Sequence, residues 1–175
     1  MRRHLFQGLL SPPLTEALAS SQDTELMQLA ETLDHAAQSR LGRSLSIRQI
    51  DAGSCNGCEL EINALSNAFY DLERFGLRFV ASPRHADVLL VTGPPTRNMR
   101  EALERTYVAT PAPKWVVSVG DCAINGGCFA GSYAVLDGLS AVIPVDLRIK
   151  GCPPSPADLL NGLLALLQDK RENIP

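Results

Sequence analysis

The chain has 175 residues, of which 45% are hydrophobic and 5% aromatic, and its formal net charge is −3. This length and apolar content suffice for one globular domain with an aliphatic core. The negative charge provides no basic field for nucleic acid, and no apolar run approaches the roughly 20 residues that span a bilayer.

Residues 1–20 are predicted to form an extended arm. A pair of arginines, four apolar side chains and then two prolines follow one another here: Arg2, Arg3, Leu5, Phe6, Leu9, Leu10, Pro12 and Pro13. The prolines prevent a continuous helix, and the apolar stretch is too short and interrupted for an export signal. The arm is expected either to anchor the chain to a partner subunit or membrane surface, or to be a loose tail.

Residues 24–40 have helical apolar spacing, with Asp23 as the expected N-cap and Gly42 as the expected end. Together with the arm, this amphipathic helix forms a predicted docking segment, residues 1–42. Residues 43–175 are predicted to form the main domain.

From residue 45 onward, short apolar strands alternate with helices. The strands are predicted at 45–50, 78–81, 88–91, 115–119 and 142–149, and the helices at 59–70, 96–107 and 159–167. This alternation predicts an α/β fold, in which helices cover both faces of a parallel sheet.

Four of the five cysteines come directly after predicted strands. Cys55 and Cys58 follow the first strand, Cys122 follows the strand at 115–119, and Cys152 follows the strand at 142–149. The carboxyl ends of parallel strands share one edge of the sheet, where ligands bind in open α/β folds. The four thiols are therefore expected to converge.

The segment GSCNGCE, residues 53–59, allows three interpretations: a redox dithiol, half of a zinc site, or one corner of an iron–sulfur cluster. Structural zinc sites with four cysteines usually use two short-spaced pairs, whereas here one CxxC pair precedes two single cysteines. A 4Fe–4S cluster is larger than one ion and takes four thiolates, so it tolerates dispersed ligands. The Cys152-Pro153 pair is also similar to the end of some ferredoxin cluster motifs.

Glycines surround these cysteines and leave backbone N–H groups free to approach sulfur; Gly53, Gly57, Gly120 and Gly151 are the expected cofactor-contacting positions. The fifth cysteine, Cys128, is interpreted as a small buried hydrophobe, with replacement of Cys122 as a ligand as the alternative. A thioredoxin-like dithiol at Cys55 and Cys58 stays a minor alternative, which leaves Cys122 and Cys152 unexplained.

Four ordered motifs resemble the small subunit of NiFe hydrogenases: SCNGCE, SPRHADVLLVTGPPTRNM, VVSVGDCAINGG and IPVDLRIKGCPPSP. The resemblance covers about residues 43–170. It is to the energy-converting and formate hydrogenlyase type, with the 20 kDa cluster-bearing subunit of respiratory complex I as the next relative. The CxxC spacing favours the hydrogenase side, because the complex I relatives have adjacent cysteines here.

The resemblance implies a flavodoxin-like domain that holds one 4Fe–4S cluster through Cys55, Cys58, Cys122 and Cys152. It also implies a NiFe large subunit, a ferredoxin-like electron-transfer subunit and membrane subunits as partners. The chain is then cytoplasmic and peripheral to the inner membrane through its complex, and it is not catalytic alone. A complex I-like quinone or ion-pumping complex without nickel is the alternative.

Two charged residues complete the predicted site. Glu59 is expected either to transfer protons at the subunit boundary or to be an ordinary first-turn helix carboxylate. Arg84 is expected to offset the negative cluster or to pair with the large subunit, with a surface ion pair as the alternative.

Overall fold

The structure is a computed structural model that describes residues 20–168, with side chains described from Glu25 onward. The predicted arm therefore lies outside the described residues, apart from Ser20. Within residues 20–168, the helices are all too short or too polar to traverse a bilayer.

Five parallel strands form one sheet, in the order β2-β1-β3-β4-β5. This is the strand order of flavodoxin-like folds, so the predicted fold class is confirmed. The central strands β3 and β4 are buried at every residue, which explains their continuous apolar sequences. The strands are β1 Leu45–Asp51, β2 Leu77–Phe79, β3 Val88–Thr92, β4 Trp115–Val119 and β5 Leu147–Ile149.

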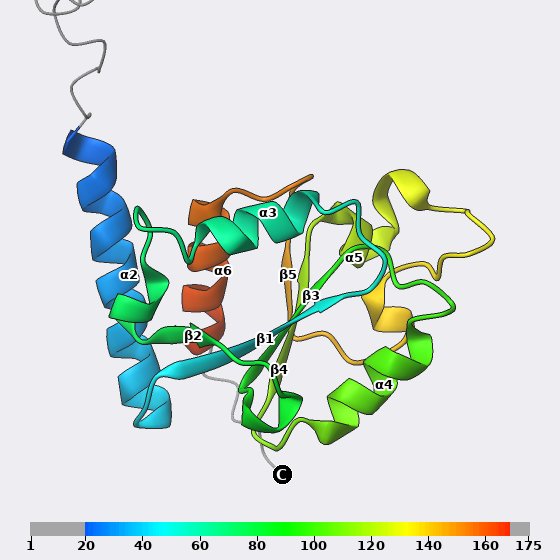
Figure 1. The fold of residues 1–175 in the computed structure, drawn as a ribbon, viewed down its shortest axis with the longest axis horizontal. Helices are drawn as coiled ribbons and strands as arrows, with labels where there is room; N and C mark the ends of the chain where they lie inside the picture. The colour runs from blue at the N-terminus through cyan, green and yellow to red at the C-terminus, as the bar shows by residue number, and fades with distance from the viewer. Residues whose placement is uncertain (1–19, 169–175) are drawn as a thin grey trace, which may run out of the picture.

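Helices cover the two faces of the sheet unequally. The helices are α2 Ser20–Leu41, α3 Gly57–Ala64, α4 Arg100–Ala109, α5 Asp121–Asn125 and α6 Pro156–Gln168. Figure 1 shows α2 and α6 side by side, and their buried leucines share one core with β1, β3 and β4. Helix α4 packs on the other face, where Leu103 belongs to a second core with Leu89 and Val116.

Helix α2 is tied to this core at its end. Arg40 Nη1 donates to the carbonyl oxygens of Leu166 and Leu167 at 3.0 and 2.8 Å, and its guanidinium lies 5.0 Å from the centre of the Trp115 ring. Gly42 then ends the helix with a positive φ of 65°, as predicted. Asp23 lies inside the helix, so its prediction as the N-cap is wrong.

Of the other predicted boundaries, two differ most from the structure. Helix α3 ends at Ala64 rather than at residue 70, because the Asn67 side chain accepts the N–H groups of Phe69 and Tyr70 and forms a turn. Strand β5 begins at Leu147 rather than at residue 142, because a 3₁₀ turn and Pro144 precede it. The 3₁₀ turns of the chain are Leu72–Phe75, Pro83–His85, Gly127–Phe129 and Leu139–Ala141.

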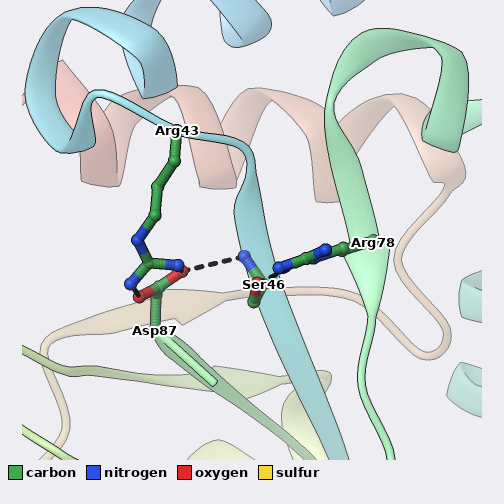
Figure 2. A network of polar contacts seen from close by, with 4 residues as sticks. All are labelled: Arg43, Ser46, Arg78 and Asp87. Carbon is green, nitrogen blue, oxygen red and sulfur yellow. Dashed lines mark hydrogen bonds and ion pairs between the residues drawn. The ribbon is translucent and has the colours of Figure 1, made fainter. Parts of the chain in front are cut away.

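A polar network joins β1, β2 and β3 at the edge where these strands begin (Figure 2). Asp87 is 3% exposed, and its carboxylate accepts two bonds from the Arg43 guanidinium and one from the Ser46 N–H, the last at 2.9 Å. The Ser46 hydroxyl accepts from Arg78 Nε at 3.1 Å. Asp87 therefore holds the segment before β1 against the start of β3.

Candidate metal centre

The turn after β1 presents the first two cysteines. Asp51 Oδ1 accepts the N–H groups of Gly53 and Ser54, both at 2.7 Å, and this fixes the turn directly after the strand. Asn56 then adopts a left-handed conformation with φ 72°. Cys55 is exposed, and Cys58 is half-buried in the first turn of α3.

The turns that carry Cys122 and Cys152 are bonded to each other. Gly120 N–H donates to the Ile149 carbonyl at 2.8 Å, and Asp121 N–H donates to the Gly151 carbonyl at 2.9 Å. The Asp121 carboxylate in turn accepts the Gly151 N–H at 3.1 Å. These three bonds extend the β4–β5 pairing past the ends of the strands, so the two turns stand side by side at the carboxyl edge of the sheet.

The other three cysteines of the predicted set lie close enough to Cys58 to affect its thiol. The pKa of Cys58 is raised to about 12, first by burial and then by Glu59, Cys122, Cys55 and Cys152. The pKa of Cys122 is raised to about 11 by burial and by its neighbours Cys128 and Cys152. Such thiols stay protonated at neutral pH unless a cation displaces the protons, as metal binding to cysteine does.

Glycines leave the space that the sulfur atoms occupy. A Cβ atom at Gly120 would lie 2.7 Å from Cys58 Sγ, and one at Gly127 would lie 2.8 Å from Cys122 Sγ. At Gly57 a Cβ atom would lie 3.6 Å from Cys55 Sγ. Gly53 and Gly151 lie in the same turns, but a Cβ atom there would clash with Thr96 and Pro154 rather than with sulfur.

This donor set fits an iron–sulfur cluster better than a single ion. Within residues 20–168, no three His, Cys, Asp or Glu side chains gather closely enough to hold one metal ion. The four thiols instead come from three turns around a shared region, and a cluster bound by four thiolates needs such wider spacing. A dithiol of Cys55 and Cys58 alone would leave the positions of Cys122 and Cys152 near Cys58 unexplained.

Glu59 belongs to this region. Its side chain follows Cys58 in the first turn of α3 and is 7% exposed. Neither carboxylate oxygen has a hydrogen-bond partner among the described residues. A buried carboxylate without a partner is costly in an isolated domain, so its position calls for a function or a contact beyond this chain.

Arg84 is not brought to the cysteines. It lies in the turn Pro83–His85 that precedes β3, at the amino edge of the sheet, and borders a shallow hollow with Val108 and Pro111. The chain crosses from the carboxyl end of β2 to the opposite edge before Arg84. Arg84 therefore lies at the opposite edge from the cysteines, and its expected pairing with the large subunit stays a prediction.

Cys128 also differs from its prediction as a buried hydrophobe, because it is exposed. The turn Gly127–Phe129 follows α5 and bends back, so that Cys128 lies in hydrogen-bond contact with Cys122. Gly126 and Gly127, with φ of 87° and 51°, make this bend possible. The glycine pair directly before Cys128 was the sequence signal for this return.

An exposed tyrosine in the loop after Cys128 was not predicted. Tyr133 is 90% exposed, yet its loop is pinned to the segment after β3. Arg97 Nε donates to the Tyr133 carbonyl at 2.7 Å, and Arg97 N–H donates to the Ala134 carbonyl at 2.9 Å. The loop therefore holds an aromatic side chain outward at the carboxyl edge.

Comparison with known proteins identifies this arrangement. The family model described as "NADH ubiquinone oxidoreductase, 20 Kd subunit" matches residues 55–166, which include all five cysteines. The chain belongs to the NADH ubiquinone oxidoreductase 20 kDa subunit family. The resemblance drawn from the four motifs is thereby confirmed, and the protein is an oxidoreductase-family subunit.

Relatives in this 20 kDa subunit family include proteins named for hydrogenases. Formate hydrogenlyase subunit 7 of Escherichia coli is 46% identical over 75% of this chain, which spans only 52% of that protein. A probable membrane-bound hydrogenase subunit of Pyrococcus furiosus is 44% identical over 73% of this chain and 77% of its own length. The chain thus spans about half of the first relative and over two thirds of the second.

Solved structures agree with this family assignment. A chain of the archaeal membrane-bound sulfane sulfur reductase is 36% identical, with a TM-score of 0.64 over 78% of this chain and 73% of that one. A chain of an NAD⁺-reducing [NiFe]-hydrogenase, at 20% identity, has a TM-score of 0.57 over 76% of this chain and 96% of that one. The second match establishes the shared fold alone.

Proposed function

We propose that this protein is the electron-transfer small subunit of a membrane-associated NiFe hydrogenase complex. In this role Cys55, Cys58, Cys122 and Cys152 hold a single 4Fe–4S cluster. The observation that carries the proposal is the position of four thiols from three strand ends at one edge of the sheet, within a family of oxidoreductase subunits. The hydrogenase names of two relatives favour this type of complex.

When bound, the cluster accepts and donates single electrons. The chain contributes the geometry around it. The bonded turns of Gly120 and Gly151 hold Cys122 and Cys152 in fixed relation, and Asp51 fixes the turn that leads to Cys55 and Cys58. Burial and hydrogen bonds to sulfur are the means by which such a site sets its potential.

The partner that covers the carboxyl edge is the hydrogenase large subunit. Cys55, Cys128 and Cys152 are exposed, so a cluster at this edge needs protein above it to exclude solvent. Tyr133, held outward on its pinned loop, is suited to anchor that contact, because rigid exposed tyrosines dominate many interfaces. Ferredoxin-like and membrane subunits of the complex complete the relay, which places the chain peripherally at the cytoplasmic side of the inner membrane.

Glu59 is proposed to pass protons at the same boundary. Its burial beside Cys58 and its two unpartnered oxygens support this role over that of an ordinary helix carboxylate. A carboxylate that protrudes into solvent from a first helical turn would be hydrated, whereas this one is enclosed.

A second candidate is the same relay in a complex without nickel. The match to a sulfane sulfur reductase chain, at 36% identity, favours it, because that complex is not named as a hydrogenase. The large subunit decides between the two: a CxxC pair near each of its ends supports nickel binding, and absence of these pairs supports the second candidate.

The relay is tested by separating chemistry at the large subunit from electron transfer through this chain. In the intact complex, Cys58→Ser should abolish H₂-driven reduction of the ferredoxin-like acceptor. Exchange of hydrogen isotopes between H₂ and water should persist, because it needs no electron outlet. The full chain alone should produce no H₂ turnover.

Measurable H₂ turnover by the isolated chain would contradict the relay role. Unchanged acceptor reduction in Cys58→Ser would contradict the ligand role of this cysteine. Loss of both isotope exchange and acceptor reduction, with the large subunit still bound, would place Cys58 in the hydrogen chemistry itself rather than in the relay.

A further inference from the structure

Among residues 20–168, one part of the sheet lacks a helical cover. Only residues 80–87 join β2 to β3, and their sole helical element is the three-residue turn Pro83–His85. Parallel strands in doubly wound sheets are ordinarily joined by a full helix. Helix α4 packs against β3 and β4 through Leu103, which leaves the β1–β2 end of this face more open.

Two arginines stand on this open face. Ser46 and Arg78 are register partners on β1 and β2, so their side chains point to the same side of the sheet. Arg48 is two residues further along β1 and shares that side. Arg78 is exposed and Arg48 is half-buried. We call Arg48 and Arg78 the arginine face.

The positive charge of the arginine face is not balanced by a carboxylate. Among residues 20–168, the ion pairs are Arg43–Asp87, Arg100–Glu104 and Arg105–Glu101, and none includes Arg48 or Arg78. Arg78 Nε bonds only to the neutral Ser46 hydroxyl. Arg48 Nε is buried and has no acceptor among the described residues.

The neighbouring carboxylate cannot serve these two residues. Figure 2 shows Asp87 directed to Arg43 and the Ser46 N–H, with Arg78 on the other side of Ser46. Both oxygens of Asp87 already accept bonds, Oδ1 one and Oδ2 two. The described residues therefore leave Arg48 Nε without an acceptor and Arg78 without a carboxylate partner.

We propose that the arginine face docks an acidic segment of another protein subunit, whose carboxylates pair with Arg48 and Arg78. Guanidinium groups bind carboxylates through paired, directional bonds, so an Asp or Glu of such a segment can pair with each of the two arginines. This contact is independent of the cysteine edge and of the nature of the reaction there.

A protein segment fits the face better than an anionic membrane. The chain carries a net charge of −3, which repels an anionic lipid surface as a whole. Arg48 is half-buried, so an acceptor that pairs with it has to reach into the sheet face. A side-chain carboxylate on an extended segment meets this condition, and a headgroup layer meets it less well.

The first experiment is a footprint of the intact complex. Hydrogen–deuterium exchange is compared between the full chain alone and the purified complex, with residues 45–50 and 77–80 as the reporting peptides. The proposal predicts slower exchange of both peptides in the complex. Equal exchange in the two samples would overturn it.

The second experiment removes the charge. Complexes that carry both Arg48→Gln and Arg78→Gln should dissociate more readily than the wild-type complex. In a salt titration, the Kd of the docked subunit should be at least about tenfold higher in the variant than in the wild type at the same salt concentration, because two charge-assisted contacts are removed. The matched control is Arg100→Gln with Arg105→Gln, two exposed arginines that pair within their own helix α4. The control complex should remain intact, and equal behaviour of the two variants would contradict the proposal.

Two further measurements keep the result unambiguous. The isolated Arg48→Gln variant should melt no lower than the wild-type chain, because Arg48 Nε has no partner to lose there, whereas Arg78→Gln also removes the bond to the Ser46 hydroxyl. Should the double variant melt lower, Arg48→Gln alone replaces it in the salt experiment. Vesicles of phosphatidylcholine with and without phosphatidylglycerol are the membrane arm. Protection of the reporting peptides on the anionic vesicles but not in the complex would assign the face to the membrane and overturn protein docking.

Discussion

Gly120 shows how closely single residues constrain the proposed site. Its φ of 82° is a conformation that side-chain-bearing residues rarely adopt, and a Cβ atom there would lie 2.7 Å from Cys58 Sγ. Gly131 is a natural comparison, because its φ is 79° but a Cβ atom would meet nothing within 4 Å. The two glycines therefore separate backbone strain from contact with sulfur.

We predict that Gly120→Ala lowers the iron content of the anaerobically purified chain, whereas Gly131→Ala does not. Both variants should lose about 1–3 kcal/mol of unfolding free energy, because both place a Cβ atom at positive φ. Iron analysis and denaturant unfolding check the two effects. Equal iron content in both variants would show that the space beside Cys58 is not needed for the cluster.

Glu59→Gln tests the proposed proton transfer. We predict unchanged iron content and an H₂ turnover of the intact complex that falls by about 10²-fold or more, as for removal of an acid–base group. The isolated variant should be no less stable than the wild type, because the buried carboxylate has no described partner. Glu61→Gln, two residues further along α3, is the control and should retain turnover. A loss of stability with normal turnover would instead identify Glu59 as a structural helix carboxylate.

At the scale of elements, helix α6 begins immediately after the Cys152 turn and has a well-formed start. Ser155 Oγ accepts the Asp158 N–H at 3.3 Å and donates to Asp158 Oδ2 at 2.6 Å, and Asp158 Oδ2 also accepts the Ser155 N–H at 3.0 Å. This reciprocal arrangement, with Pro156 at the first helical position, is a capping box. It connects the stability of α6 to the turn that presents Cys152.

We predict that Ser155→Ala lowers the unfolding free energy by about 1 kcal/mol and the melting temperature by about 2–4 °C at pH 7. The bonds from Ser155 hold the pKa of Asp158 below its ordinary value. A lowered folded-state pKa means that this stabilisation is present above the ordinary pKa and is lost as pH falls through the folded-state value. The difference in melting temperature between variant and wild type should therefore narrow as the pH falls. Thermal melts at pH 7 and in acid, below the ordinary pKa of an aspartate, check this. A difference that does not depend on pH would contradict the role of the Asp158 carboxylate.

The elements that were predicted correctly are those whose sequence pattern alone determines them. Continuous apolar residues at β3 and β4, and repeated leucines in α6, need no distant partner to be recognised. The errors lie where a side chain ends or delays an element. Asn67 ends α3 early, and Pro144 with its preceding 3₁₀ turn delays β5.

At the scale of the whole molecule, parallel strand order explains why the cysteine site was foreseeable. Once Cys55, Cys58, Cys122 and Cys152 are assigned to the ends of parallel strands, the topology places them at one edge. The edge at which Arg84 lies was not foreseeable, because the sequence gives no sign of which edge the β2–β3 connection has reached. The arginine face was invisible for a related reason, since it depends on register between β1 and β2 and on which helix covers them.

The most direct test of the account is iron and acid-labile sulfide analysis of the full chain, purified anaerobically as wild type, Cys122→Ser and Cys128→Ser. We predict about four iron and four sulfide per wild-type chain, a marked loss in Cys122→Ser and no loss in Cys128→Ser. Zinc without sulfide in the wild type, or iron lost in Cys128→Ser and retained in Cys122→Ser, would contradict the proposed cluster or its ligand set.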